Sequence, residues 1–157
     1  MSTGFSNTLI CDIDGTLADN EQRQHLVLSG KDPGDQFYLR CVDDIPIANA
    51  QEGQQSLFQY LSEAGSWRVL YITGRDEICR KETLWWLKKH EFLDGELRMR
   101  SRLDSRTSFV VKSELACDIE GRRVLAIDDD SQVLELYQDF GFGTFYAPRC
   151  WKRLSGK

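Results

Sequence analysis

The sequence contains few histidines and no clustered cysteines, which limits the metal sites it can form. Only two histidines occur among the 157 residues, and the five cysteines are widely spaced without a Cys-x-x-Cys pair. Zinc sites require tighter groups of these residues, and disulfide-stabilised secreted domains contain a higher density of cysteine. We therefore expect reduced thiols, a cytoplasmic protein and no zinc site.

Long apolar runs and an excess of basic charge are also lacking. No run approaches the roughly 20 apolar residues that a membrane-spanning helix needs. Residues 1–7 do not contain a basic segment followed by an apolar one, so we expect no signal peptide. The formal net charge of −5 argues against a protein that binds nucleic acid over its whole surface. We expect a protein that does not interact with membranes.

What the sequence does contain is typical of a globular domain. Hydrophobic residues make up 41% and charged residues 29%, and neither repeats nor low-complexity tracts are visible. The length is close to the commonest size of one domain. We predict a single domain over residues 1–157.

Apolar segments alternate with helical patterns along the chain. The predicted strands cover residues 8–13, 68–73, 96–99, 124–127 and 143–147, and the predicted helices cover residues 47–64, 79–90, 109–119 and 133–140. In the second helix, Leu84, Trp85 and Leu87 are predicted to face the core. Strands that alternate with helices indicate a three-layer, doubly wound α/β fold with a five-stranded parallel sheet.

Carboxylates follow two of these predicted strands. Asp12 and Asp14 end the first, and Asp128 and Asp129 follow the fourth. In doubly wound sheets, ligands bind beyond the carboxyl ends of the strands. Carboxylates this close repel one another, and a hard cation relieves the repulsion. Ligands that are all oxygen atoms suit Mg²⁺, so we predict a magnesium site formed by these four residues.

Two further features could bind phosphate. Thr73, Gly74 and Arg75 end the second predicted strand and offer a hydroxyl, a backbone N–H and a guanidinium group. Lys112 follows two valines near a predicted helix start, which could direct its ammonium group inward. Each feature alone is also compatible with an ordinary turn or a solvated helix surface.

Together these segments resemble the motifs of the haloacid dehalogenase-like (HAD) phosphohydrolases. The four motifs are matched in their usual order by residues 9–17, residues 72–75, Lys112 and residues 127–129. The resemblance implies a Rossmann-like HAD fold and a Mg²⁺-dependent phosphatase. It implies that Asp12 is the nucleophile and forms an aspartyl-phosphate, and that Asp14 is the general acid and then the general base.

The same resemblance implies roles for the remaining residues. Thr73 would hydrogen-bond the phosphoryl group, and Lys112 would bridge nucleophile and substrate. Asp129, or alternatively Asp128, would bind the metal directly. Asp12 would contribute a carboxylate oxygen to the metal, and Asp14 its backbone carbonyl.

Residues 99–137 are similar to the 3′-phosphatase domain of bacteriophage polynucleotide kinases. This implies removal of 3′-phosphates from nucleic-acid ends, although Asp130 stands where the phage domain usually has arginine. The alternatives are a phosphatase for nucleotides or other small esters, and a non-catalytic phosphate- or partner-binding module. The sequence contains no P-loop motif, so we expect no P-loop kinase half in this chain. A partner that supplies a kinase or ligase activity is a further possibility.

The segment between the first two strands is short for a cap domain. We predict a small cap-like insert at about residues 18–46 with one short helix near 35–42, and hence an open site suited to the end of a large molecule. Residues 98–112 contain five basic residues and one acidic residue. Arg100 and Arg106 in this stretch, with Gly74 and Arg75, are our predicted substrate contacts; a solvated loop is the alternative.

Overall fold

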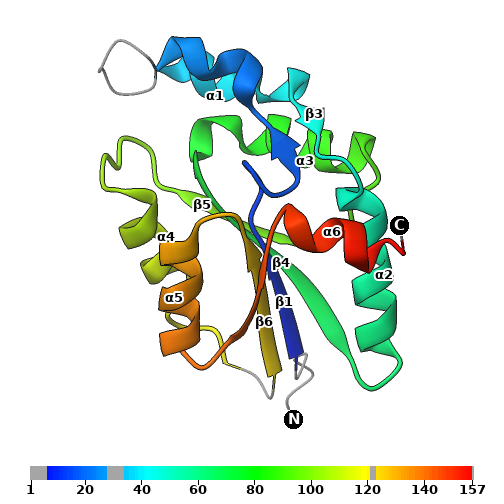
Figure 1. Cartoon of the computed structure of the whole chain (residues 1–157). Coiled ribbons are helices and arrows are strands. Elements are labelled where there is room, and N and C mark those ends of the chain that lie inside the picture. Colours follow the sequence, from blue (N-terminus) through cyan, green and yellow to red (C-terminus); the bar gives the residue numbers. More distant parts are fainter. Residues whose placement is uncertain (1–6, 28–33, 121–122, 157) are drawn as a thin grey trace.

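The protein forms a five-stranded parallel sheet between two layers of helices (Figure 1). The computed structural model describes residues 7–27, 34–120 and 123–156. The strand order is β5-β4-β1-β6-β7, and each neighbouring pair is parallel. The strands are β1 (Asn7–Cys11), β4 (Trp67–Asp76), β5 (Glu96–Arg100), β6 (Arg123–Asp128) and β7 (Gly143–Tyr146). The predicted fold class is confirmed.

Both faces of the sheet are buried, because successive side chains of a strand point to opposite faces. On β1, Leu9 and Cys11 belong to one apolar cluster and Ile10 to the other. Helices α2 (Ala50–Ser62), α3 (Arg80–Lys89) and α6 (Arg149–Leu154) cover the first face. Helices α4 (Ser108–Ala116) and α5 (Ser131–Asp139) cover the second (Figure 1). This explains why the central strands read as unbroken apolar runs.

Helix α3 corrects one prediction about the core. Its inward side chains include Trp86 and Leu87, whereas Leu84 is 42% and Trp85 51% exposed. The predictions for Leu84 and Trp85 were therefore wrong, and that for Leu87 is confirmed. A 3-10 turn, η3 (Glu77–Cys79), directly precedes the helix. The sequence pattern does not distinguish adjacent large apolar residues on such a helix.

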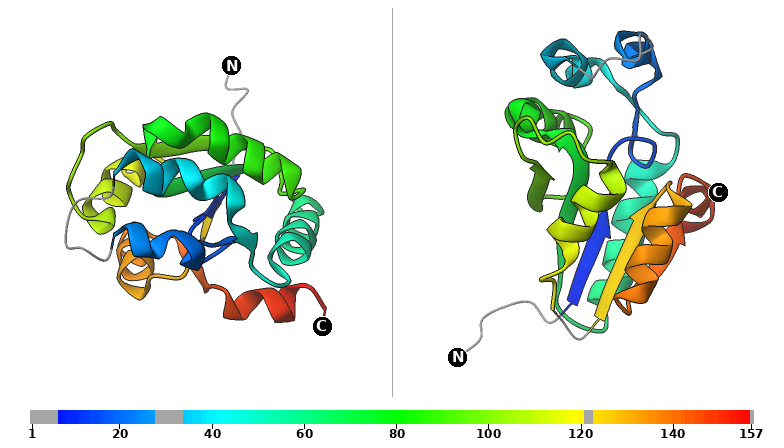
Figure 2. Two further views of the ribbon diagram at one scale, coloured as in Figure 1. Left: turned by 90° about the horizontal axis from the view of Figure 1, so that it is seen from above. Right: turned by 90° about the vertical axis from the view of Figure 1, so that its left-hand side faces the viewer.

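The chain between β1 and α2 contributes a small layer beyond the carboxyl ends of the strands (Figure 2). Its elements are β2 (Ala18–Asp19), η1 (Glu21–Leu26), α1 (Asp35–Leu39), η2 (Arg40–Asp43) and β3 (Ile45–Pro46). β2 and β3 pair antiparallel and close the segment. The predicted short helix near residues 35–42 corresponds to α1 and η2. In the part of the chain that the structure describes, no helix has the length and apolarity needed to cross a membrane.

Candidate active site

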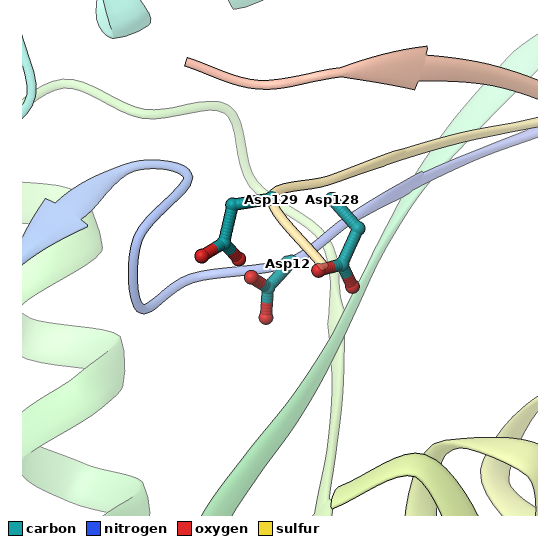
Figure 3. A group of neighbouring side chains, drawn as sticks. All are labelled: Asp12, Asp128 and Asp129. Atoms are coloured by element: carbon teal, nitrogen blue, oxygen red, sulfur yellow. The ribbon is translucent and has the colours of Figure 1, made fainter. Parts of the chain in front are cut away.

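Three carboxyl groups converge where β1 and β6 end side by side. Asp12 directly follows β1, and its amide donates to the carbonyl of Ile127 at 3.0 Å. Asp128 ends β6 and Asp129 follows it. Asp12, Asp128 and Asp129 each offer a carboxylate oxygen within 4.8 Å of the others, and Figure 3 shows the three groups turned toward one another. Neighbouring parallel strands thus bring together acids that lie more than a hundred residues apart.

The cluster is electrostatically strained as it stands. Burial, followed by repulsion from Asp12, raises the pKa of Asp128 to about 6. Burial and the proximity of Asp12 and Asp128 raise the pKa of Asp129 to about 8. Such shifts mean that the three groups resist being ionised together, which a cation among them would relieve. The donor set consists only of oxygen atoms and fits Mg²⁺.

Lys112 links two of these acids. From the second turn of α4, its Nζ donates to Asp12 Oδ1 and to Asp128 Oδ2, both at 2.8 Å. The side chain is buried, which by itself lowers the pKa of Lys112, but Asp12 and Asp128 raise the pKa well above its usual value. The lysine is therefore a fixed positive charge beside Asp12.

The turn after Asp12 provides a second hydrogen-bond donor to its carboxylate. Thr16 Oγ1 donates to Asp12 Oδ2 at 2.9 Å, so that both oxygens of Asp12 have hydrogen-bond partners. Gly15 has a φ of +81°, and a Cβ at this position would lie 2.2 Å from Asp129 Oδ2. Only glycine combines this backbone conformation with such a close approach.

Asp14 lies beside this cluster in a separate network of ion pairs. Arg75 donates to it through Nε at 3.0 Å and through Nη2 at 2.7 Å, and Arg23 Nη2 donates at 2.9 Å. Both arginines also pair with the buried Asp44. Burial raises the pKa of Asp14, but the charges of Arg75 and then Arg23 outweigh it, and the pKa falls below its usual value. The network therefore keeps Asp14 ionised.

Sequence reasoning missed two members of this network. Arg23 and Asp44 come from the segment 18–46 and are fully or almost fully buried. Their sequence context does not differ from that of surface residues, so no signal pointed to them. Arg75, predicted as a substrate contact, has two aspartates and the hydroxyl of Thr83 as partners. A direct contact of Arg75 with substrate stays a prediction.

Thr73 and Gly74 lie in an irregular stretch of β4 between Ile72 and Asp76. Thr73 Oγ1 accepts the backbone amide of Arg75 at 3.1 Å. A Cβ on Gly74 would lie 2.6 Å from the hydroxyl oxygen of Ser108, at the start of α4. The strand end and the helix start therefore approach closely only because residue 74 is glycine.

Arg100 forms hydrogen bonds that hold the loop after β5 in place. Its guanidinium donates to the carbonyl of Gly74 at 2.7 Å, to that of Asp104 at 3.1 Å and also to that of Arg106. Arg106 itself pairs with Asp104 and Glu114. The basic stretch 98–112 is thus largely tied to carboxylates and carbonyls of the protein.

These side chains surround one cavity of about 340 Å³. Nine of the predicted site residues line it, and Arg106 does not. The lining consists of Asp12, Asp14, Asn20, Phe37, Tyr38, Thr73, Gly74, Arg75, Arg100, Ser108, Lys112, Asp128, Asp129 and Asp130. Asp14 reaches the cavity, but its carboxylate lies outside the group of three acids, and its predicted backbone contact with a metal stays a prediction. The aromatic residues Phe37 and Tyr38 were not anticipated.

The parallel sheet, the strand-end acids and the buried lysine define a HAD-like phosphatase. The class C acid phosphatase from Bacillus anthracis has the same fold, with a TM-score of 0.54 at 12% identity over 93% of this chain and 68% of that one. Residues 6–148 match the family described as the polynucleotide kinase PNKP phosphatase domain, and the chain belongs to this family. It is a phosphoric monoester hydrolase.

Other relatives are larger proteins. Chains in two structures of a Pnkp1/Rnl/Hen1 complex align with TM-scores of 0.66 and 0.68 at 23% and 25% identity, over 93% of this chain and 43% and 47% of theirs. A protein of Autographa californica nuclear polyhedrosis virus, named as a bifunctional polynucleotide kinase/RNA ligase, is 24% identical over 146 residues, which are 90% of this chain and 19% of that protein. The chain thus spans less than half of these relatives.

Proposed function

We propose that this protein is a Mg²⁺-dependent phosphatase that removes 3′-phosphates from nucleic-acid ends through an aspartyl-phosphate on Asp12. The observation that carries the proposal is the position of Asp12. Its carboxylate is hydrogen-bonded to Lys112 and lies close enough to Asp128 and Asp129 for one metal ion to contact all three. Phosphoryl transfer depends mainly on positioning and charge neutralisation, which this arrangement supplies.

The charge balance of the cavity supports a bound divalent cation. Five aspartates line it against two arginines and one lysine, so that the lining has a formal excess of two negative charges when all its groups are ionised. An anionic phosphate would be repelled unless a cation entered first. Asp12 and Asp129 would hold Mg²⁺ directly with the backbone carbonyl of Asp14, and Asp128 would bind directly or support the site. Bound there, Mg²⁺ would neutralise charge on the transferring phosphoryl group.

Asp12 is the proposed nucleophile. One carboxylate oxygen attacks phosphorus, the bond from phosphorus to the ester oxygen breaks, and the phosphoryl group remains on Asp12. Lys112 neutralises negative charge on the nucleophile and the phosphoryl oxygens. Thr73 and the amide of Gly74 hold the phosphoryl group at the other strand end. The turn residue Thr16 fixes the orientation of the Asp12 carboxylate.

Asp14 is the proposed general acid and base. It takes up a proton from solvent and delivers it to the departing ester oxygen. As a carboxylate it then removes a proton from the water that attacks the aspartyl-phosphate, which breaks the bond from phosphorus to Asp12 and releases phosphate. Arg23 and Arg75 position its carboxylate. Because these two cations favour the ionised form, Asp14 must gain a proton before the first step, whereas the second step uses the carboxylate that they stabilise.

A nucleic-acid end is the proposed substrate. The family and the names of the larger relatives, which include an RNA repair complex and a kinase/ligase, support it. We propose that the insert at about residues 18–46 is a small cap, which would keep the site open to a long strand. Arg100, in the cavity wall, and Arg106, outside it, are the proposed contacts with the strand. We also propose a kinase or ligase partner and, from the free cysteines, a cytoplasmic location.

The test is a substrate panel with Mg²⁺, comparing 3′- and 5′-phosphorylated DNA and RNA with mononucleotides. The expected result is a preference for 3′-phosphorylated strands, whereas faster turnover of mononucleotides would favour a small-ester phosphatase. Soaking crystals with beryllium fluoride and Mg²⁺ should add density to Asp12. Absence of that density, together with no turnover of any substrate, would favour a non-catalytic binding module.

A further inference from the structure

A second cavity adjoins the carboxylate cavity on the side of α1. Its volume is about 240 Å³, and its lining is Asp35, Tyr38, Asp76, Arg100, Arg102, Leu103, Asp104, Ser105 and Arg106. Tyr38 and Arg100 belong to the linings of both cavities. A substrate whose phosphate reaches the first cavity can therefore place its next chemical group in the second.

The second cavity is not built for a phosphate. Its lining contains three arginines and three aspartates and has no net formal charge. The arginines already have partners, because Arg100 donates to backbone carbonyls and the other two form ion pairs. These pairs are Arg102 with Asp35 and Asp76, and Arg106 with Asp104 and Glu114. An uncharged part of the substrate fits this environment better than a second phosphate.

Leu103 is the unusual residue of this lining. Its side chain is 86% exposed, and its backbone has a φ of +65°, a region that bulky residues avoid. Its amide donates to Asp76 Oδ2 at 3.4 Å, and Arg100 holds the same loop through the carbonyl of Asp104. Neither solvation nor backbone energy favours this placement of a leucine. Strained residues of this kind cluster at ligand-binding positions.

The lining of the second cavity also contains one aromatic residue, Tyr38. Tyr38 is half-buried on α1, where its inner part packs on the core and its remainder lines both cavities. Phe37, which lines only the first cavity, lies next to it, edge to face, with ring centroids 5.2 Å apart. Aromatic rings paired with aliphatic side chains are how proteins commonly hold an unstacked nucleobase.

We infer that the second cavity binds the base of the nucleoside that carries the terminal phosphate, with Tyr38 and Leu103 as its contacts. This rests on the proposed function and adds a specificity element to it. Every base has a π-face, so such a contact recognises a nucleoside without selecting its base. It favours a phosphate on a nucleoside over the same phosphate on a bare sugar.

The experiment compares two 3′-phosphorylated trinucleotides, one complete and one whose terminal sugar lacks its base. For the wild-type protein, removal of the base should lower kcat/KM roughly tenfold, in the range known for base stacking. For Tyr38→Ala and for Leu103→Ala, the ratio of the two kcat/KM values should approach one. Tyr38→Phe should keep most of the ratio, since the ring remains.

Two matched variants control for general effects. Tyr60→Ala and Ile45→Ala remove exposed apolar side chains outside both cavities, 71% and 65% exposed in the wild type, and should leave the ratio unchanged. Leu103 is so exposed that its loss should not disturb folding, even if Tyr38→Ala were unstable. Equal rates on the two trinucleotides in the wild type, or an undiminished ratio in Leu103→Ala, would overturn the inference. Turnover of p-nitrophenyl phosphate but of neither trinucleotide would show instead that the proposed function fails.

Discussion

Arg75 forms a bidentate ion pair with Asp14, in which Nε lies 3.0 Å from Oδ2 and Nη2 lies 2.7 Å from Oδ1. The two residues come from the ends of neighbouring strands, and the arginine is 1% exposed. A buried guanidinium that makes two hydrogen bonds to one carboxylate fixes its position and stabilises its negative charge. If Asp14 exchanges protons with substrate and water, Arg75 and Arg23 together position it for both.

Replacing Arg75 by lysine keeps the charge but removes the planar fork. We expect kcat on an alkyl phosphate to fall about 100-fold, the lower range of a general acid's contribution. The loss on p-nitrophenyl phosphate should be smaller, because its leaving group needs less proton assistance. Steady-state kinetics with both substrates would measure this, with Arg68→Lys, near the start of β4 and away from the site, as a matched control. Equal losses of kcat on both substrates would contradict a role of Arg75 in proton transfer to the leaving group.

Asp12→Asn should abolish turnover, because an amide oxygen cannot form the aspartyl-phosphate. We expect kcat to fall by about 10³-fold or more, as for other nucleophile replacements. The change preserves shape, so circular dichroism should show a folded protein. Asp19→Asn, at an exposed aspartate of β2, is the control and should retain wild-type kcat. Normal turnover by the Asp12→Asn protein would exclude Asp12 as nucleophile.

Gly15→Ala tests how closely the turn after β1 approaches the proposed metal site. The added Cβ would lie 2.2 Å from Asp129 Oδ2 and must displace this carboxylate. We expect the Mg²⁺ concentration for half-maximal activity to rise about tenfold, in addition to a backbone cost of about 1 kcal/mol or more. Gly141→Ala is a matched control, since its φ is +88° and its Cβ would meet nothing within 4 Å. A similar Mg²⁺ requirement in both variants would contradict the prediction.

Trp151→Phe tests the support that α6 gives to the same turn. The Trp151 Nε1 donates to the carbonyl of Thr16 at 2.8 Å, and both residues are fully buried. Phenylalanine leaves this carbonyl without its partner, so we expect a loss of about 1–3 kcal/mol in the free energy of unfolding. Denaturant unfolding would measure it. Trp85→Phe, at a half-exposed position on α3, should change stability by less than about 0.5 kcal/mol.

Removal of Mg²⁺ should lower both activity and thermal stability. A ligand that binds only the folded protein at one hundred times its Kd adds about 2.7 kcal/mol, which for a domain of this size raises Tm by roughly 5–10 °C. Calorimetry of the wild type with Mg²⁺ and with a chelator should show this difference. In Asp129→Asn it should largely disappear, whereas the exposed-site variant Asp118→Asn should behave as wild type. An unchanged wild-type Tm at saturating Mg²⁺ would contradict the proposed site.

The local predictions were reliable where the pattern alone sets the structure. Strands β1, β4 and β6 were found because short apolar runs between turn signals, rich in β-branched and aliphatic residues, are typical of buried strands. Acids directly after two such runs had to emerge at one edge of a parallel sheet. The sequence does not determine how a helix is rotated about its axis. For Trp85 and Trp86 it indicates that the two side chains point in different directions, but not which of them is buried.

By itself, the sequence determined the order of the elements, the α/β class and the placement of Asp12, Asp14, Asp128 and Asp129 at strand ends. Only the tertiary structure decided that Arg23 and Asp44 surround Asp14, and that Arg75 faces a carboxylate. It also placed Tyr38 and Leu103 in one cavity. The reason is physical: periodicity and turn chemistry act between near neighbours in the chain, whereas the partner of a charged side chain depends on how distant segments pack.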